Sequence, residues 1–375
     1  MLPSVSIIIP HFNRVRLLHD TLRSLQAQTL ADWEAIVVDD GSEPEEWKKA
    51  QQFADSRIRF LQRADGMKGP SRCRNIGLKA STGRFVMFVD SDDVVAPWCL
   101  AERVTQLAAN SDVAYCVFPV MLFQKTPGDT ATLWNRLEGN NDLERFLRSD
   151  PPWHTSSPLW RRQAIEELRG FDEEIMYGDD ADLHMRALFA GIPYEKVDGV
   201  LPDVFIRRAA EIRITNTLSE RVLDSRLIRL ERGSRLLQQF GTTEQCRQWE
   251  GQYFVEAEFL LFSVSGSGKR QIEVLNAWQQ AWAPNVLQRF TAAAYMAFAR
   301  ATKNRLYIAL RAARRLAMMF LPQSFFPVQG GFEAVELSNE RLLQIRHGVS
   351  DDVLMSVHGE SNRSTCLARR DHRCC

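Results

Sequence analysis

The sequence of 375 residues lacks the features of several specialised protein classes. No apolar run reaches the roughly 18 residues that a membrane-spanning helix needs. Residues 1–10 have neither a basic start nor an apolar run of signal-peptide length, so we expect no export signal. Net charge is also absent, because 47 acidic residues balance 47 basic ones, and no overall field attracts nucleic acid. Any membrane contact is therefore expected to be peripheral.

Other absences narrow the class further. The seven cysteines are odd in number and lack the paired spacing of a metal site, which favours a reducing cytoplasm. No Gly-x-Gly-x-x-Gly turn follows the first apolar run, which argues against a dinucleotide-dependent oxidoreductase. No internal repeat is found, so a solenoid is not supported. An apolar share of 45% with 25% charged residues is typical of an ordinary folded protein.

The first ~120 residues alternate short β-branched runs with helical patterns, which is typical of an α/β sheet with helices on both faces. Strands are expected at 4–9, 35–39, 58–61 and 84–89, and helices at 17–25 and 71–79. Later helical patterns cover 218–240, 244–263 and 286–320. The sequence thus predicts an α/β domain over 1–205, a helical region over 206–326 and a partly disordered tail over 327–375.

Polar clusters follow three of the expected strands: Pro10-His-Phe-Asn13, Asp39-Asp-Gly-Ser42 and Asp90-Ser-Asp-Asp93. Ligands of open α/β sheets bind beyond the carboxyl ends of the strands, so these clusters should converge on one edge. On an extended backbone, Asp90 and Asp92 would point to the same side and could face one Mg²⁺ or Mn²⁺ ion with its phosphates. The alternative is a solvated acidic turn that caps the helix beginning near Pro97.

These clusters belong to an ordered series of motifs. Ser6-Ile-Ile-Ile-Pro-His-Phe-Asn13, Val37-Val-Asp-Asp-Gly-Ser42, Arg74-Asn-Ile-Gly77 with Gly83, and Asp90-Ser-Asp-Asp93 are followed by Gly170-Phe-Asp-Glu173 and Gly178-Asp-Asp-Ala-Asp-Leu183. The series resembles that of family 2 glycosyltransferases with the GT-A fold, a nucleotide-diphospho-sugar transferase fold with a Rossmann-like mixed sheet. The resemblance covers residues 4–205, which would be the catalytic domain, and leaves the helical remainder unassigned.

The resemblance implies roles for particular residues. Asp40 would accept a hydrogen bond from the nucleotide base, Phe12 would lie against its ring, and Pro10 and Asp39 would shape the pocket. Arg74 would interact with donor phosphates or with the neighbouring acidic loop. Asp92 and Asp90, with Ser91 between them, would hold the donor diphosphate and its metal ion. Asp180 would take the proton from the acceptor hydroxyl in an inverting displacement.

Several residues have a second interpretation. Phe12 could belong to the core, and Asp180 could cap the helix that follows it. The usual Glu-Asp pair of the family reads Asp179-Asp180 here, which leaves the role of Asp179 less defined. Trp153, His154 and Asp179 are the acceptor-side candidates, with a structural role as the alternative. The family's histidine after the last core strand is absent, so Arg207 and Arg208 either meet the phosphates or form a surface pair.

The stretch 295–326 mixes apolar residues with arginine and lysine. A basic amphipathic helix there could lie on anionic lipid and bring the site to a lipid-linked acceptor at the inner face of the membrane. The alternatives are a helix packed on the catalytic domain or at a homodimer interface.

Together these features predict a metal-dependent hexosyltransferase that moves a sugar from a nucleotide-diphosphate donor to an acceptor hydroxyl in cell-surface glycan biosynthesis. UDP is the expected nucleotide. The absent Gln-x-x-Arg-Trp signature favours single-sugar transfer over polymerisation. The alternatives are a noncatalytic nucleotide-sugar-binding protein, against which Asp92 and Asp180 argue together, and a nucleotidyltransferase, which should carry a glycine-rich basic loop after its first strand.

Overall fold

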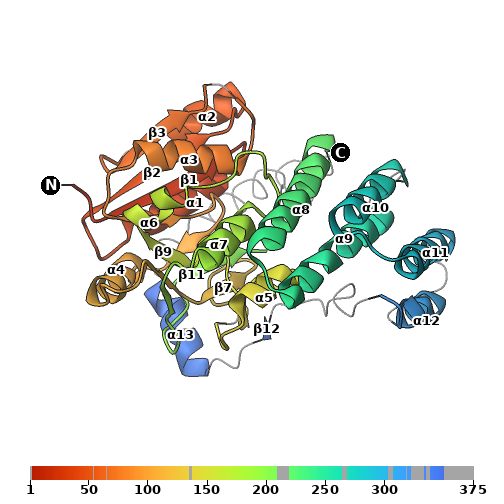
Figure 1. Cartoon of the computed structure of the whole chain (residues 1–375). Helices are drawn as coiled ribbons and strands as arrows, with labels where there is room; N and C mark the ends of the chain where they lie inside the picture. The colour runs from red at the N-terminus through yellow and green to blue at the C-terminus, as the bar shows by residue number, and fades with distance from the viewer. Residues whose placement is uncertain are drawn as a thin grey trace, which may run out of the picture.

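The computed structural model describes residues 2–53, 55–64, 66–134, 137–208, 219–263, 268–302, 307–317, 319–321, 333–334 and 338–349. Within these ranges the chain forms an α/β part with two sheets, followed by an array of helices (Figure 1). The part of the chain covered by these ranges contains no helix with the length and apolar character that a membrane crossing requires.

The larger sheet has seven strands in the order β10-β6-β9-β4-β1-β2-β3. They are β1 (Val5–His11), β2 (Trp33–Asp39), β3 (Ile58–Gln62), β4 (Phe85–Phe88), β6 (Tyr115–Val117), β9 (Pro158–Arg161) and β10 (Tyr194–Lys196). The four expected strands form the parallel set β4-β1-β2-β3, whereas β9 runs antiparallel to β4 and β6. The carboxyl ends of the parallel strands therefore meet at one edge, as the sequence predicted.

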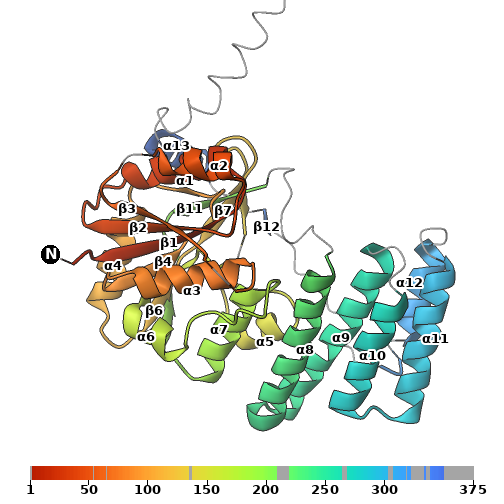
Figure 2. The ribbon, with the colours of Figure 1, turned by 90° about the horizontal axis from the view of Figure 1, so that it is seen from above.

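Helices cover both faces of this sheet, and the alternation of side chains along β1 shows how they divide (Figure 2). Ile7 and Ile9 point into a core formed with α1 (Val15–Gln26), α2 (Pro44–Gln51) and α4 (Cys99–Ala109). Ile8 points into the opposite core, formed with α3 (Pro70–Ala80), α6 (Arg162–Glu167) and α7 (Asp179–Phe189). A strand that is apolar on both sides must be covered on both sides, which produces the three-layer arrangement.

A smaller sheet lies beside the first, in the order β12-β8-β7-β11-β5. Its strands are β5 (Val94–Val95), β7 (Val120–Phe123), β8 (Thr132–Leu133), β11 (Val204–Arg207) and β12 (Glu333–Ala334). The last described helix, α13 (Asn339–Gly348), buries Ile345 in a cluster with Met121 and Phe205 of this sheet. Part of the stretch expected as a tail is thus an ordered helix on the α/β part; residues 350–375 lie outside the described ranges.

The helical array consists of α8 (Glu220–Phe240), α9 (Thr243–Ser263), α10 (Gly268–Trp282), α11 (Val286–Thr302) and α12 (Tyr307–Ala317), which stand side by side in Figure 2. The first two match the helical patterns of the sequence, and α10 was missed. The helical pattern over 286–320 corresponds to two helices, because α12 packs back against α11. Folding back lets the two halves bury apolar side chains on each other, which one straight helix could not do.

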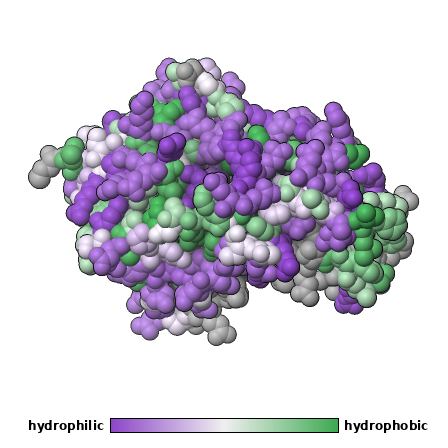
Figure 3. Space-filling model, viewed as in Figure 1, coloured by the Kyte–Doolittle hydropathy of each residue, from purple (hydrophilic) through white to green (hydrophobic). Residues whose placement is uncertain are grey.

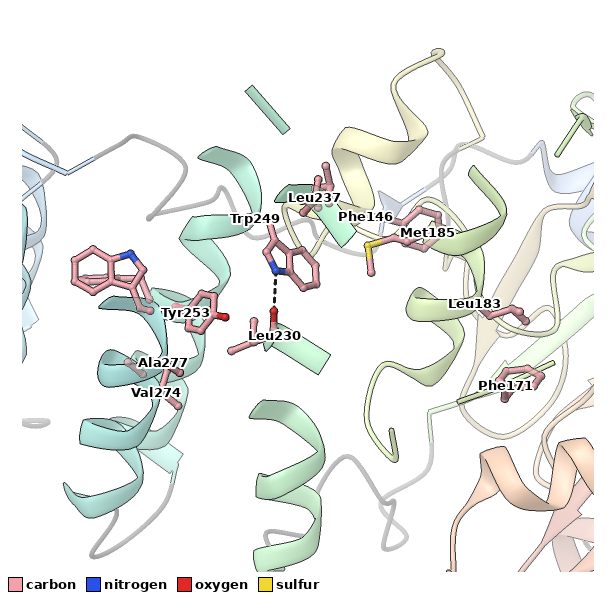
Figure 4. Close-up of a cluster of buried hydrophobic side chains, with 14 of the residues drawn as sticks. Phe146, Phe171, Leu183, Met185, Leu230, Leu237, Trp249, Tyr253, Val274 and Ala277 are labelled. Atoms are coloured by element: carbon pink, nitrogen blue, oxygen red, sulfur yellow. Dashed lines mark hydrogen bonds between the residues drawn. The ribbon is translucent and has the colours of Figure 1, made fainter. Parts of the chain in front are cut away.

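One apolar core joins the array to the α/β part through α5 (Asp142–Leu147) and α7. Figure 4 shows Trp249 of α9 beside Leu230 and Leu237 of α8, with Phe146 and Met185 on the adjoining helices. The Trp249 indole Nε1 donates a hydrogen bond to the Leu230 carbonyl oxygen at 3.1 Å. Gly233 has no side chain at this contact because a Cβ there would lie 2.1 Å from the Trp249 ring.

Candidate active site

The candidate site lies where the loops after β1, β2 and β4 meet the first turns of α3 and α7. The paired register of β1 and β2 places His11 opposite Asp39, and the Asp40 amide donates to the His11 carbonyl oxygen at 2.8 Å. A surface groove of about 680 Å³ lined by Lys79, Arg162 and Arg169 shares no residue with these loops. The polar strand ends, rather than this groove, define the site.

The loop after β2 is shaped by its two aspartates in different ways. The buried Asp39 carboxylate accepts hydrogen bonds from the backbone N–H groups of Gly41 and Ser42, at 3.1 and 3.0 Å. Gly41 adopts a φ of +90°, a conformation that favours glycine. Asp40 accepts from Arg63 Nε at 2.8 Å and from the Gly69 amide at 3.0 Å. Asp39 therefore fixes the loop internally, whereas Asp40 ties it to the start of α3.

The loop after β1 presents Phe12 next to this turn. Its ring is 44% exposed and lies 4.9 Å from Lys68 Nζ, so Phe12 is not a core residue. The preceding Pro10 is half-buried at the end of the strand. Asn13, at a φ of 47°, accepts a hydrogen bond from the Glu43 amide at 2.8 Å and links the two loops. An exposed ring in this position is available for stacking on a planar ligand.

Asp90–Asp93 form a tight turn, closed by a hydrogen bond from the Asp93 amide to the Asp90 carbonyl oxygen at 3.1 Å. The extended backbone expected here is therefore wrong. The turn gives the carboxylates different partners: Asp90 accepts from Arg74 at 2.7 Å and Asp92 from Arg14 at 3.1 Å. Ser91 is buried.

Arg74 connects this turn to the first turn of α7. Its buried guanidinium donates to Asp179 at 2.5 Å and to Asp90 at 2.7 Å, and it lies 5.1 Å from the Phe171 ring centroid. Of the two roles expected for Arg74, the structure shows the contact with the acidic loop. Burial would raise the pKa of Asp90, but the charge of Arg74, with that of His154, outweighs it and leaves this pKa below its usual value.

Asp179 and Asp180 are adjacent in the sequence but differ in their contacts. Asp179 is buried and accepts from Ser71 Oγ at 3.0 Å as well as from Arg74, so it holds α3 to α7. Within the described residues, Asp180 makes no ion pair, and its carboxylate accepts from the Ala181 amide at 2.8 Å. Burial raises the pKa of Asp180 and the charge of Asp90 adds to this, although Arg74 opposes both. Asp180 thus combines an unpaired carboxylate with an increased proton affinity.

The other two acceptor-side candidates, Trp153 and His154, also differ in their surroundings. Trp153 is fully buried against Phe146 and His184, so the expectation that its ring meets an acceptor is wrong. His154 lies at the site instead, with Nε2 3.9 Å from an Asp90 carboxylate oxygen. Its ring packs edge-on against Trp134 at 5.5 Å between centroids.

Arg207 at the end of β11 does not extend into the site. It is buried, pairs with Asp20 at 3.0 Å and donates to the Asp92 carbonyl oxygen at 3.1 Å. Contact with phosphates and a surface pair were the alternatives for Arg207, and its buried guanidinium, which supports the acidic turn from behind, fits neither. Arg208 is exposed, and residues 209–210 lie outside the described ranges.

A row of arginines on α8 was not anticipated from the sequence. Arg226 lies 3.8 Å from the Tyr177 ring centroid, Arg229 packs on Gly178, and Arg232 forms ion pairs with Asp172 and Glu174. All three hold the loop that leads into Asp179 and Asp180. Their spacing of three residues along one helix face was visible in the sequence, but the acidic partners of Arg232 lie about 60 residues earlier in the chain, and Arg226 also pairs with Glu256, which lies later.

Comparison with known proteins identifies the class. Residues 6–168 match the family model described as glycosyl transferase family 2. The solved structure of S. aureus TarS 1–349 in complex with UDP-GlcNAc superposes with a TM-score of 0.59 at 16% identity and covers 90% of this chain and 97% of that one. The fold is thus the GT-A type of glycosyltransferase, and residues 6–168 of this chain resemble glycosyl transferase family 2.

Relatives of known sequence match over shorter lengths. An uncharacterised glycosyltransferase of Bacillus subtilis, EpsJ, is 31% identical over 50% of this chain and 56% of its own length. The GalNAc(5)-diNAcBac-PP-undecaprenol beta-1,3-glucosyltransferase of Campylobacter jejuni is 31% identical over 48% of this chain and 59% of its own. The Escherichia coli protein WfgD, named as a UDP-Glc:alpha-D-GlcNAc-diphosphoundecaprenol beta-1,3-glucosyltransferase, is 36% identical over 28% and 42%. This chain therefore spans about half the length of these relatives.

Proposed function

We propose that the protein is an inverting glycosyltransferase that moves a hexosyl group from a UDP-sugar to the hydroxyl of a lipid-linked glycan acceptor, in the synthesis of a cell-surface polysaccharide. The observation that carries this proposal is the contrast between Asp180, which is unpaired among the described residues, and its neighbour Asp179, which is held by Arg74. Two of the relatives are named for glucosyl transfer to undecaprenol-linked acceptors, which supports the acceptor class.

In this proposal the donor nucleotide lies over the loops after β1 and β2. The exposed Phe12 ring lies against the base, and Asp40 accepts a hydrogen bond from it, while Pro10 and Asp39 fix the pocket. Asp40 is well placed for this role because Arg63 and the Gly69 amide already hold its side chain in one orientation. Ser91 lies between the two aspartates that meet the diphosphate.

Asp180 acts as the general base of the reaction. Its carboxylate accepts the proton of the acceptor hydroxyl while that oxygen bonds to the anomeric carbon and the nucleotide diphosphate leaves from the opposite face. A single displacement of this kind inverts the configuration. The raised pKa of Asp180 strengthens it as a proton acceptor, provided that the pH stays above that pKa. Asp179, with Arg74, positions the base.

The acidic turn fits a divalent cation that is shared with the donor. No three histidine, cysteine, aspartate or glutamate side chains among the described residues form a metal site by themselves. Mg²⁺, however, is usually bound through one or two carboxylates plus substrate phosphates. Asp90 and Asp92 would supply the carboxylates, and the His154 imidazole beside Asp90 adds a ligand that Mn²⁺ accepts. When bound, the metal would neutralise charge that develops on the leaving diphosphate.

The same proposal assigns the parts of the chain. Residues 1–205 form the catalytic domain, 206–326 the helical region, and 327–375 a tail of which only α13 and β12 are described. Arg226, Arg229 and Arg232 give the helical region a role in positioning the loop before α7. Nucleotide sugars and undecaprenol-linked acceptors meet at the inner face of a membrane, so we place the enzyme there, on the cytoplasmic side. The proposal gives nucleic acid no role.

Two variants separate donor binding from transfer. Asp92→Asn should abolish metal-dependent binding of a UDP-sugar in titration calorimetry, whereas Asp180→Asn should bind the donor normally and lower transfer by roughly 10²–10⁴-fold. The matched control is Asp182→Asn, because Asp182 lies two residues from the base but pairs with Arg186 at 2.8 Å. It should transfer at the parental rate.

The outcomes decide between the alternatives. Transfer by Asp180→Asn at the parental rate would refute the base assignment. Donor binding by the parental protein without transfer to any undecaprenol-linked acceptor would favour a noncatalytic nucleotide-sugar-binding protein. Release of pyrophosphate from a nucleoside triphosphate and a sugar phosphate would identify a nucleotidyltransferase.

A further inference from the structure

The far end of the helical array exposes large apolar side chains. Figure 3 shows apolar residues gathered at the right-hand end of the molecule, over α11 and α12. We call this surface the outer face and define it by six exposed residues: Val286, Leu287, Phe290, Leu316, Met319 and Phe320. Phe290 is 71% exposed and Met319 73%. Apolar surface of this kind on a folded protein marks a site of interaction.

The composition of α11 explains why the outer face is apolar. Its inward side buries Ala292, Tyr295 and Met296 in the core of the array. Its outward side continues from Phe290 with Ala293, Ala294 and Ala297, and no charged residue occurs between Arg289 and Arg300. Between these two arginines the helix is apolar on both its inward and its outward side, a composition typical of a helix that is covered on both sides by protein or lipid. The outer face therefore needs a partner.

The charge around the outer face indicates which partner. Residues 274–332 contain seven lysines and arginines and no acidic residue, although the whole chain is neutral and keeps 40 basic and 47 acidic residues elsewhere. Arg289, Arg300 and Arg315 are exposed on the two helices. A second copy of the chain meeting this face would bring like charges together. An anionic surface complements both the charge and the apolar side chains.

We propose that the outer face docks on a membrane that contains anionic lipid, with Phe290 and its apolar neighbours among the acyl chains and the arginines at the headgroups. The described helices are not of membrane-spanning character, so the contact lies in the plane of the interface. This inference extends the proposed function by adding a binding surface, and it does not depend on transfer activity. The sequence predicted a basic amphipathic helix over 295–326, whereas the outer face begins at Val286 and involves two antiparallel helices. Residues 303–306, 318 and 322–326 of that stretch lie outside the described ranges.

The test is co-sedimentation of the full chain with vesicles, without donor or acceptor. The parental protein should bind vesicles that contain phosphatidylglycerol and bind pure phosphatidylcholine vesicles much more weakly. Phe290→Asp should abolish binding, and its matched control is Phe240→Asp, which changes a 65% exposed phenylalanine at the end of α8. Arg289→Gln with Arg315→Gln should lower the partition coefficient by roughly 25-fold, because each basic residue near an anionic surface contributes about fivefold. Arg23→Gln with Arg148→Gln, both exposed in the α/β part, is the control for charge.

Each outcome decides the proposal. Equal binding by Phe290→Asp and Phe240→Asp, or by the two arginine pairs, would overturn it. Light scattering adds a second readout: if Phe290→Asp converted a dimer to a monomer and left vesicle binding intact, the outer face would be a contact between two copies. Because the assay contains no sugar donor, a negative result would leave the transferase proposal untouched, and failure of transfer would not affect this one.

Discussion

Removal of the Arg74 guanidinium should have a larger effect than removal of any single surface charge. Arg74→Met keeps an unbranched apolar side chain but leaves the carboxylates of Asp90 and Asp179 without their cation. Loss of one partner from a buried ion pair costs about 3–5 kcal/mol, because the remaining charge stays buried and uncompensated. Asp179, the more buried of the two carboxylates, dominates this cost. We therefore expect the free energy of unfolding to fall by about that amount at neutral pH.

The loss should depend on pH in a defined direction. In the parental protein the pKa of Asp90 is lowered, whereas burial already raises the pKa of Asp179 to about 6. Without Arg74, the folded-state pKa of both carboxylates should be higher than in the parental protein and above the value of about 3.9 that an aspartate has in the unfolded chain. A group with a raised folded pKa stabilises the protein fully below its unfolded pKa, and this stability is lost as the pH rises through the folded pKa. The difference between Arg74→Met and the parental protein should therefore shrink as the pH falls from 7 towards 5.

Urea denaturation at several pH values measures this difference, and calorimetry with a UDP-sugar measures donor binding. The matched control is Lys196→Met, which removes the cation paired with the buried Asp142 at 2.8 Å, away from the acidic turn. It should lose stability and keep donor binding, whereas Arg74→Met should lose both. A loss below about 1 kcal/mol that does not change with pH would show that Arg74 does not hold two buried charges.

Three further predictions follow from the same structure. The acid limb of the kcat/KM profile should lie above the usual carboxylate range, because transfer needs Asp180 deprotonated and its pKa is raised; a limb near pH 4 would contradict this. Arg232→Gln should lower kcat a few-fold and leave donor affinity unchanged, because the loop before α7 loses two ion pairs; an altered Kd with normal kcat would refute the positioning role. Gly77→Ala should destabilise the protein by about 1–3 kcal/mol, because its Cβ would lie 2.4 Å from Ile8 Cγ2, whereas Gly268→Ala, with no described atom within 4 Å, should not.

The sequence predicted the parallel strands and the edge of the sheet that bears the site. Both follow from local signals: apolar runs such as that of β1 form buried strands, and the polar residues after them must lie at the carboxyl ends. The positions of Asp40 and Asp90 at one edge were thus accessible without a structure, whereas Asp180 was singled out through the family resemblance. Their assigned roles stay proposals.

The pairing of charges was not accessible in the same way. Arg74 and Asp179 are separated by 105 positions, and Arg232 reaches back 58 positions to Glu174. Such contacts depend on how α7 and α8 pack, which no short pattern specifies. The expected extended backbone at Asp90 failed for a related reason: the turn is closed by its own hydrogen bond. The burial of Trp153 depends on aromatic partners from three separate segments.

The first turn of α7 shows how two neighbouring carboxylates acquire different properties from one arginine. Both lie at a helix start in a buried environment, where two uncompensated negative charges would repel each other. Arg74 reaches Asp179, which also accepts from Ser71, and so the cation is committed to that side chain. Asp180 is left with backbone hydrogen bonds, while burial raises the pKa of both carboxylates, that of Asp179 to about 6. For Asp179 to act as the base and Asp180 as the residue that positions it, Arg74 would have to move to Asp180 and break its contact with Asp179. The same guanidinium therefore determines which aspartate is the base and which one positions it.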